Sequence, residues 1–321
     1  MKKILIFENS VYSLLLFILH NKNWNECDYV FFGERLPISV RENIKKIIKG
    51  KGTTENISLS LRKHTLISYI KMLKHLKYKS NEYDLICGNV REISFFDPQK
   101  TIQISDGVMT IQEIKNNLYS DVLSLPHKFR LILLGRRRFK YMPPKKYLLE
   151  TNSWSEEKIE SRIIFVDMKK SWNSLGHYQQ KRVLEVFSLD AHEFDFGYRN
   201  TLLVTQPLNE EGFCSEGDKK NGYLRLINDL NINHEHLIIK PHPRELTDYK
   251  KCFPKAFILP SHFPIELLFL MGLPFEKLIT LWSTVSYFVP SNVILYKMGN
   301  IDYFNLSSKV PKYKAKILGD I

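Results

Sequence analysis

The chain opens with two apolar runs that a short polar turn separates. Lys3–Phe7 is followed by Glu8-Asn9-Ser10, and a second apolar run extends over Val11–Leu19. This order predicts a buried strand, a turn in which Asn9 or Ser10 caps a helix, and then the helix itself. Neither run reaches the roughly 18 residues that span a bilayer. No small-residue cleavage site follows the second run, so we expect a cytoplasmic protein without a membrane span.

Similar apolar runs recur through the first 190 residues. We predict further strands over Tyr29–Phe32, Leu85–Cys87, Thr101–Ile104 and Ile163–Val166, and helical patterns lie between several of them, such as Thr65–Leu76. Strands that alternate with helices are typical of a mostly parallel sheet with helices on both faces.

A mixed polar segment, Ser188–Asn200, separates this pattern from a second one. The second pattern predicts strands over 202–205, 236–240, 256–259 and 277–281, and helices over 222–230, 264–271 and 283–288. Two Rossmann-like halves joined by one linker describe the GT-B architecture. We therefore predict an α/β, GT-B-like fold with two Rossmann-like domains, residues 1–190 and 191–321, and a cleft between them.

Composition narrows the class of protein. Hydrophobic residues make up 44% and charged residues 25%, which excludes a disordered chain. The 47 Lys and Arg outweigh the 34 Asp and Glu by 13 charges, and the densest basic stretch is 136–146. A positive surface of this kind favours an anionic membrane, a phosphorylated substrate or a nucleic acid as partner. No recognisable nucleic-acid-binding module accompanies the charge.

The cysteines and the missing motifs exclude several kinds of site. The four cysteines lie far apart without a C-x-x-C pair, so neither a zinc site nor a disulfide framework is indicated. The chain contains no G-x-x-x-x-G-K-S/T loop and no G-x-G-x-x-G turn, which disfavours P-loop NTPases and dinucleotide-dependent oxidoreductases.

One string of chemically functional side chains lies at the end of the strand predicted over 236–240. It reads Lys240-Pro241-His242-Pro243-Arg244. The two prolines fix the backbone around the histidine, and open α/β sheets bind ligands at the carboxyl ends of their strands. Lys240, His242 and Arg244 together give three cationic donors, which we expect to bind a phosphate.

Two more strings lie at predicted strand ends. Ser105-Asp106-Gly107 places a carboxylate at a sharp turn, and Ser283-Thr284 places two hydroxyls where a strand meets a helix. Hydroxyls and free amides at a helix start can bind an anion. Each string alone is also consistent with an ordinary turn or cap.

In this order the acidic-Gly turn, the His-Pro pair and the hydroxyl pair resemble the motifs of bacterial sialyltransferases, above all glycosyltransferase family 52. Bacterial polysialyltransferases share similar motifs. The resemblance implies inverting transfer of sialic acid from CMP-sialic acid to a sugar hydroxyl, without a required metal or other cofactor. It makes Asp106 the general base, with Glu210 in reserve. The residues implied in binding the nucleotide are Lys240, His242, Pro243, Arg244, Glu266, Ser283 and Thr284.

The same resemblance implies the partners. The acceptor is a glycan of a bacterial surface structure, capsule or lipooligosaccharide, and a lipid-linked acceptor would bring the protein to the inner face of the cell membrane, where residues 136–146 would contact anionic lipid. A specific nucleic acid is not expected. The alternatives are a polysialyltransferase, a GT-B transferase with another nucleotide sugar, and a basic protein without enzymatic activity that binds nucleic acid or membranes. A homodimer is left open.

Overall fold

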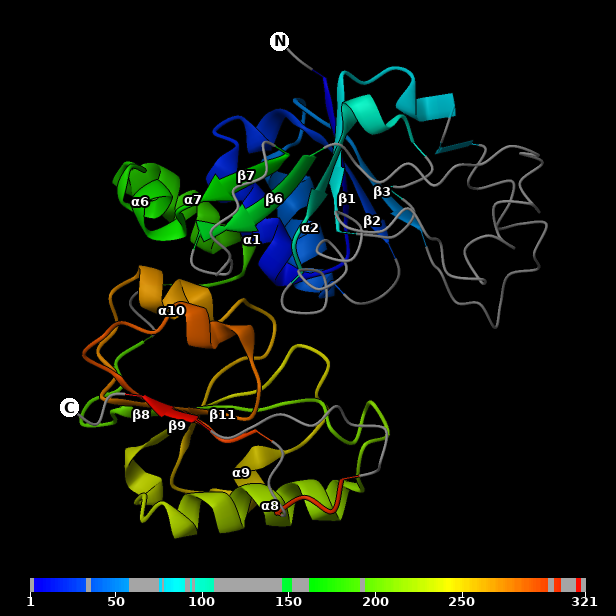
Figure 1. Ribbon diagram of the computed structural model, residues 1–321. Helices are drawn as coiled ribbons and strands as arrows, with labels where there is room; N and C mark the ends of the chain where they lie inside the picture. The colour runs from blue at the N-terminus through cyan, green and yellow to red at the C-terminus, as the bar shows by residue number, and fades with distance from the viewer. Residues whose placement is uncertain are drawn as a thin grey trace. The chain divides into compact units, whose positions relative to one another are not determined.

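The computed structural model describes residues 3–32, 36–57, 75–76, 78–89, 93, 96–106, 146–151, 162–190, 194–299, 303–306 and 316–318. Contacts between Cα atoms divide the chain into two units, Met1–Val186 and Phe187–Ile321 (Figure 1). The sequence pattern placed the domain boundary after residue 190. In the described ranges no helix is long and apolar enough to cross a membrane.

The first unit contains a seven-stranded parallel sheet with the order β3-β2-β1-β4-β5-β6-β7. Its strands are β1 (Ile4–Glu8), β2 (Asp28–Phe32), β3 (Thr54–Ile57), β4 (Leu85–Gly88), β5 (Thr101–Ile104), β6 (Lys146–Glu150) and β7 (Ile163–Val166). Its α-helices in the described ranges are α1 (Val11–His20), α2 (Ile38–Ile47), α6 (Met168–Asn173) and α7 (His177–Val186). The five strands predicted from the sequence are confirmed, whereas β3 and β6 were missed. Most of the helix predicted over Thr65–Leu76 lies outside the described residues.

Helix α1 shows how the first polar turn organises the fold. Ser10 is the N-cap, and its side chain accepts a hydrogen bond from the Ser13 N–H at 3.2 Å, as the sequence predicted for Asn9 or Ser10. Eight of the ten helix residues are buried. Because the helix is almost entirely apolar, it packs tightly onto the sheet, and it also contacts α6.

The second unit contains a six-stranded sheet with the order β10-β9-β8-β11-β12-β13, parallel except for β13. Its strands are β8 (Thr201–Val204), β9 (Leu237–Lys240), β10 (Phe257–Ile258), β11 (Lys277–Thr280), β12 (Ile294–Lys297) and β13 (Lys316–Leu318). Its α-helices in the described ranges are α8 (Glu216–Asp229), α9 (Tyr249–Cys252) and α10 (Glu266–Leu270), and its 3-10 turns there are η6 (His234–His236) and η7 (Thr284–Tyr287). The sequence missed β12 and β13. It also predicted a longer helix over 283–288, where the chain makes a single 3-10 turn before Pro290.

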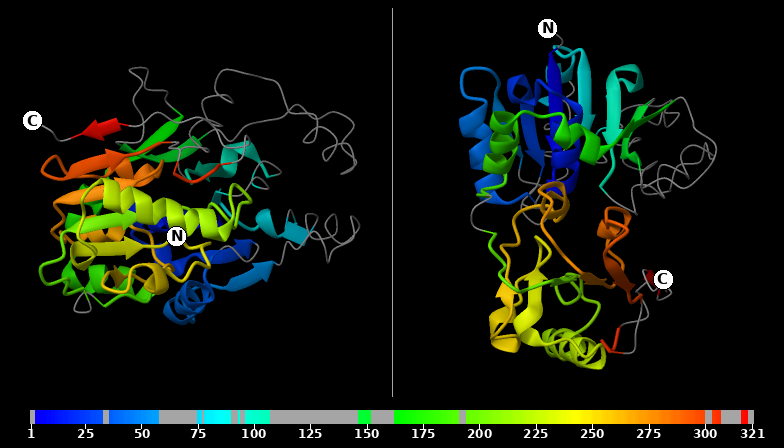
Figure 2. Two further views of the ribbon diagram at one scale, coloured as in Figure 1. Left: turned by 90° about the horizontal axis from the view of Figure 1, so that it is seen from below. Right: turned by 90° about the vertical axis from the view of Figure 1, so that its left-hand side faces the viewer.

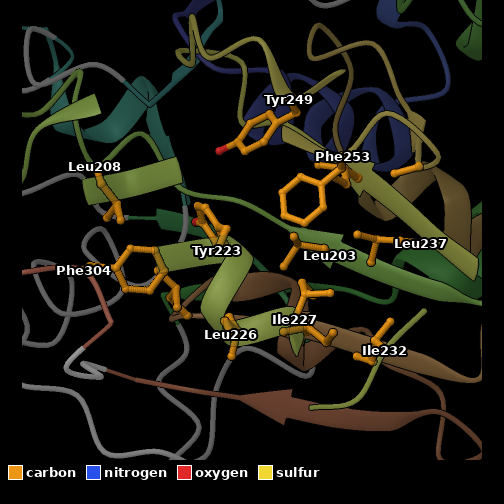
Figure 3. Packing of buried hydrophobic residues seen from close by; sticks show 14 residues of the cluster. Leu203, Leu208, Tyr223, Leu226, Ile227, Ile232, Leu237, Tyr249, Phe253 and Phe304 are labelled. Carbon is orange, nitrogen blue, oxygen red and sulfur yellow. The ribbon is translucent and has the colours of Figure 1, made fainter. Parts of the chain in front are cut away.

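Helices cover both faces of this second sheet. Helix α8 runs along one face together with α9, and α10 lies on the other (Figures 1 and 2). On the α8 face Leu203 of β8 and Leu237 of β9 belong to one buried cluster with Tyr223 and Phe253 (Figure 3). Strand residues that are buried in succession are typical of a parallel sheet with two covered faces. The predicted α/β class is confirmed for both units.

Each sheet has one point at which its strand order reverses. In the first sheet this point lies between β1 and β4, and in the second it lies between β8 and β11. The chain leaves the two neighbouring strands in opposite directions there, so that the loops separate and leave room at the carboxyl ends. Ligand sites are therefore expected beside the carboxyl ends of these strands.

Candidate functional site

The His-Pro turn at the end of β9 is fixed by its own backbone. The His242 N–H donates to Glu245 Oε2 at 2.6 Å, and the Arg244 N–H donates to His242 Nδ1 at 3.1 Å. The imidazole is thereby oriented by a hydrogen bond from its own turn. The sequence expectation of a stiffly presented histidine at a strand end agrees with this geometry.

The protonation state of His242 follows from its surroundings. Burial lowers the pKa of His242 to about 3, and the positive charges of Arg244, Lys240 and Lys219 act in the same direction. The imidazole is therefore neutral near pH 7. Since Nδ1 accepts a hydrogen bond, the single proton resides on Nε2. His242 is a neutral N–H donor, and the sequence expectation of a cationic donor at this position is wrong.

Lys240 and Arg244, which were expected to bind a phosphate together with His242, have different surroundings. Lys240 is only 2% exposed, and its ammonium donates to the main-chain oxygens of Pro241 at 2.9 Å and Ser261 at 3.1 Å. Burial lowers the pKa of Lys240 to about 7, against the opposing charges of two nearby carboxylates. Arg244 is exposed and lies 2.5 Å from Glu211. Lys240 therefore supports the turn from inside, and Arg244 remains the solvent-facing cation of the string.

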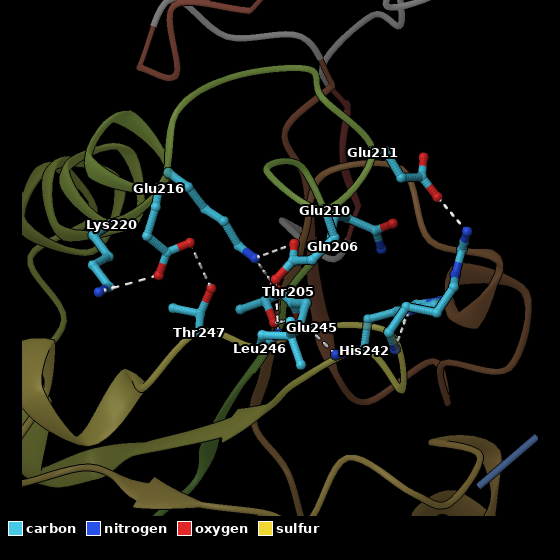
Figure 4. Close-up of polar contacts among 12 residues, drawn as sticks. Thr205, Gln206, Glu210, Glu211, Glu216, Lys220, His242, Glu245, Leu246 and Thr247 are labelled. Atoms are coloured by element: carbon cyan, nitrogen blue, oxygen red, sulfur yellow. Dashed lines mark hydrogen bonds and ion pairs between the residues drawn. The ribbon is translucent and has the colours of Figure 1, made fainter. Parts of the chain in front are cut away.

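A buried acid that the sequence did not single out holds this turn in place. The Glu245 carboxylate accepts from the Thr205 hydroxyl at 2.5 Å and from the His242 N–H (Figure 4). It further accepts from the Tyr249 hydroxyl at 2.7 Å. It also lies 2.7 Å from the Lys219 ammonium, and both side chains are fully buried. Glu245 thus joins β8, α8, α9 and the His-Pro turn through one carboxylate, which fixes the edge of the sheet at its reversal point.

The reserve base, Glu210, belongs to the same network. Its two oxygens accept from the Lys219 ammonium at 2.9 Å and from the Leu246 N–H at 2.7 Å. Partial burial acts to raise the pKa of Glu210, but these two hydrogen bonds outweigh it and hold the pKa below its usual value. A carboxylate with both oxygens engaged and a lowered pKa is a weak base. Both oxygens of Glu210 already accept hydrogen bonds, and its role as the reserve base stays a prediction.

The hydroxyl string lies at the end of β11, on the other side of β8 from the His-Pro turn. Ser283 is the N-cap of η7, and its hydroxyl accepts from the Val285 N–H at 3.3 Å. The side chain of Thr284 lies outside the described residues. The sequence missed Lys297, which ends β12 and whose ammonium donates to the Ser286 hydroxyl at 3.2 Å. The turn that begins at Ser283 and the Lys297 side chain therefore lie next to each other at the carboxyl ends of β11 and β12.

Glu266, the acid expected to contact cytidine, is 4% exposed and opens α10. Its negative charge raises the pKa of Lys240 against the effect of burial, which places the two side chains close to each other. A role toward a nucleotide stays a prediction.

The expected base, Asp106, is in the first unit. It is the second residue after the end of β5 and is exposed, whereas Ser105 is buried and its N–H donates to the Leu148 oxygen at 3.0 Å. Gly107 of the same string lies outside the described residues, as do residues 136–145 of the basic stretch. An exposed carboxylate at a strand end is chemically able to accept a proton.

A pocket of about 390 Å³ in the first unit is lined by parts of α1, α6 and α7 and by the ends of β6 and β7. His20, Trp24, Asp167 and Lys170 are among its lining residues. None of the site residues predicted from the sequence lines this pocket. Nothing in its lining indicates a reaction, so the candidate site is the set of strand ends described above.

Comparison with known proteins agrees with these features. The model of glycosyltransferase family 52 matches residues 96–301. An uncharacterized protein of Haemophilus influenzae is 24% identical over 324 residues, which cover 94% of this chain and all of that protein.

Two solved structures share the fold. The GT-B domain of a sialyltransferase from Photobacterium damselae superposes with a TM-score of 0.58 at 11% identity, and the match covers 90% of this chain and 89% of that one. An α/β-galactoside α-2,3-sialyltransferase from Photobacterium phosphoreum gives 0.55 at 12% identity, with 94% and 92% covered. At such identities the likeness concerns the fold.

The family match extends over more than half of the chain, from the end of the first unit's β4–β5 connection to the end of β12. It confirms the family resemblance that the three strings indicated, and the alternatives without enzymatic activity are thereby set aside. The chain belongs to glycosyltransferase family 52, and it is a glycosyltransferase with an α/β fold of the GT-B type.

Proposed function

We propose that this glycosyltransferase moves sialic acid from CMP-sialic acid to a sugar hydroxyl of a bacterial surface glycan, capsule or lipooligosaccharide. The observation that carries the proposal is the position of His242 at the carboxyl end of β9, one strand from the reversal point, with its Nδ1 bonded to its own turn. The order of the three strings and the likeness to sialyltransferases of known fold support the same donor.

The departing group is a nucleoside monophosphate, which gains negative charge as its bond to the sugar breaks. His242 donates its Nε2 proton in a hydrogen bond to a phosphate oxygen, and the Ser283 turn supplies hydroxyl and amide donors. Lys297, which is bonded to Ser286 in that turn, brings a positive charge to the same edge. Fixed donors of this kind stabilise the leaving phosphate, so that the transfer proceeds without a required metal.

The acceptor hydroxyl needs a base. Asp106 accepts its proton while the acceptor oxygen bonds to the anomeric carbon and the bond from that carbon to the phosphate breaks. CMP leaves with the electron pair of the broken bond. Attack from the face opposite the phosphate inverts the anomeric centre, as in inverting glycosidases, where a carboxylate activates the nucleophile on the far side of the sugar.

The positive charge of the chain suits an acceptor at a membrane. A lipid-linked glycan would be presented at an anionic surface, and residues 136–146 contribute six of the excess cations: Arg136, Arg137, Arg138, Lys140, Lys145 and Lys146. Co-sedimentation with vesicles that depends on anionic lipid supports this contact. Binding that is equal with neutral lipid counts against it.

A donor screen tests the proposal. The purified protein is offered CMP-sialic acid and, separately, uridine and guanosine diphosphate sugars with a mixture of galactose-terminated acceptors. Turnover restricted to CMP-sialic acid is expected, and His242→Ala and Asp106→Ala each remove it with the fold intact, whereas Glu210→Gln does not remove the base. Turnover with a diphosphate sugar alone, or full activity of His242→Ala, would refute the assignment. Product length separates single transfer from polymer formation.

A further inference from the structure

An ion pair lies beside the His-Pro turn, and the proposed reaction gives its acid no part. Glu211 belongs to the loop between β8 and α8, and its Oε1 lies 2.5 Å from Nη1 of Arg244 (Figure 4). The Arg244 side chain is 43% exposed and the Glu211 side chain is 30% exposed. An acid of the protein therefore already occupies the guanidinium that was expected to bind a phosphate.

The backbone of this loop is held against the turn. Glu210 accepts from the Leu246 N–H at 2.7 Å, which joins the loop to the residue two positions after Arg244. The N–H of Glu211 donates to the Pro207 oxygen at 3.0 Å within the loop. Because these bonds hold the main chain, only the side chain of Glu211 has to move for Arg244 to be released.

The two neighbouring acids of the loop differ in how easily they give up their partners. Glu210 is paired with Lys219, and the two side chains are 13% and 0% exposed. Breaking a buried pair of this kind leaves a charge without a partner inside the protein. The pair of Glu211 with Arg244 is in contact with water, and exposed pairs contribute little to stability. Glu211 can therefore be displaced with little loss of stability, whereas Glu210 cannot.

Arg244 is also the cation of the string that an anion in solution can reach. Lys240 is 2% exposed and donates to two main-chain oxygens, and Lys219 is fully buried against Glu245. A guanidinium binds a carboxylate or a phosphate through the same planar pair of N–H donors. An incoming oxyanion and the Glu211 carboxylate therefore compete for one group.

We propose that Glu211 sets the affinity for the donor: its carboxylate occupies the Arg244 guanidinium in the absence of donor, and an oxyanion of the donor displaces it. The inference rests on the proposed function, whose donor carries two oxyanions, the phosphate and the carboxylate of the sugar. Binding has to break the internal pair and to bring a second negative charge close to the displaced carboxylate. Glu211 therefore weakens donor binding, and it regains Arg244 when the nucleotide leaves.

The test is a calorimetric titration of CMP-sialic acid, without acceptor, into the protein and its variants at low salt concentration. Glu211→Gln keeps the shape of the side chain and removes its charge. Loss of the competing pair strengthens binding by up to about fivefold, and loss of the repulsion adds to this, so we expect about three- to tenfold tighter binding. A side chain that merely supported the turn would weaken binding when it is replaced.

Two comparisons show whether the effect acts through Arg244. Glu216→Gln removes an acid at the start of α8 that is 35% exposed and lies 3.1 Å from Lys220, and it is expected to leave the affinity unchanged. In Arg244→Gln, which binds the donor more weakly, the addition of Glu211→Gln is expected to bring no gain. A gain of equal size in that background would show general charge repulsion and would overturn the proposal, as would unchanged or weaker binding by Glu211→Gln alone.

Further titrations separate the two oxyanions, and the donor from the role of Glu211. A gain of the same size with CMP assigns the phosphate as the competing group, and a gain with CMP-sialic acid alone assigns the sugar carboxylate. A uridine diphosphate sugar is titrated in parallel. If only this sugar binds, and Glu211→Gln binds it more tightly, the proposed donor fails and the role of Glu211 stands. If CMP-sialic acid binds both proteins equally, the donor stands and the role of Glu211 fails; no binding of either sugar nucleotide overturns both.

Discussion

Glu245 gives the sharpest prediction about the site, because one buried carboxylate receives four donors. Replacement by glutamine keeps the shape and removes two of the four acceptor directions, since an amide nitrogen can only donate. The hydroxyls of Thr205 and Tyr249 can turn to accept, but the His242 N–H and the Lys219 ammonium cannot. Whichever way the amide is oriented, one of these two obligate donors faces another donor.

The expected magnitude follows from burial. Breaking one partner of a fully buried, hydrogen-bonded ion pair costs about 3–5 kcal/mol in the free energy of unfolding. With an m-value of about 2 kcal/mol per molar urea, the midpoint of the second unit falls by about 2 M. Released from Glu245, the His-Pro turn also loses its fixed position. We therefore expect kcat/KM for transfer to fall by about two orders of magnitude under conditions in which the variant is folded.

The assay is urea unfolding followed by hydrogen exchange of the amides in α8 and β9, which report on this unit alone. Glu235→Gln, which breaks an exposed pair with Lys255, is the matched control and should leave the midpoint unchanged. Lys219→Met and the double variant complete a cycle. A coupling free energy near zero between Glu245→Gln and Lys219→Met, or a Glu245→Gln midpoint equal to that of the control, would refute the network.

Three further predictions concern other parts of the second unit. Gly222→Ala would place a Cβ 2.3 Å from the buried Phe304 ring, and overpacking of this kind costs about 1–3 kcal/mol, measured as a lower urea midpoint that Phe304→Leu partly restores. Lys240 has a folded-state pKa near 7, below its unfolded value, so the unfolded chain binds more protons between pH 7 and about 10 and stability rises with pH there; Lys240→Met should flatten that rise in thermal unfolding. Lys297→Met should raise the donor KM about tenfold, with Lys297→Arg in between, whereas Lys277→Met at the opposite end of β11 should not change it.

The sequence predicted those strands and helix starts that a local pattern of apolar and polar residues determines. Apolar runs located β5, β9 and β11, the strands that precede the three strings, and the polar turn at Asn9 and Ser10 predicted the start of α1. The sequence missed the strands Lys146–Glu150 and Ile294–Lys297. The first directly follows a basic stretch, and apolar and polar residues alternate less clearly in the second. Their burial depends on the strands beside them, which the local pattern does not show. The helix expected over 283–288 is a single 3-10 turn, Thr284–Tyr287.

The sequence predicted where His242 lies but not its protonation state. The position of His242 at a strand end followed from its two prolines, but its charge depends on burial and on Lys219, which is 23 residues away in sequence. Lys219 itself looks like one of a pair of surface lysines on a polar helix, and Glu245 looks like the end of a charged string. Only the contact between them, which joins α8 to the His-Pro turn, shows that both are buried.

The central claim is that the carboxyl edge of the second sheet binds the monophosphate of a cytidine nucleotide through neutral His242. Calorimetric titration of CMP into the unsubstituted protein and into His242→Ala, at the same pH and salt concentration, tests it most directly. The account predicts saturable binding that weakens about 10- to 100-fold in His242→Ala, because a hydrogen bond to a charged phosphate is lost, with hydrogen-exchange protection of β9 unchanged. Equal affinity of the two proteins for CMP, or no binding of CMP to either, would contradict it.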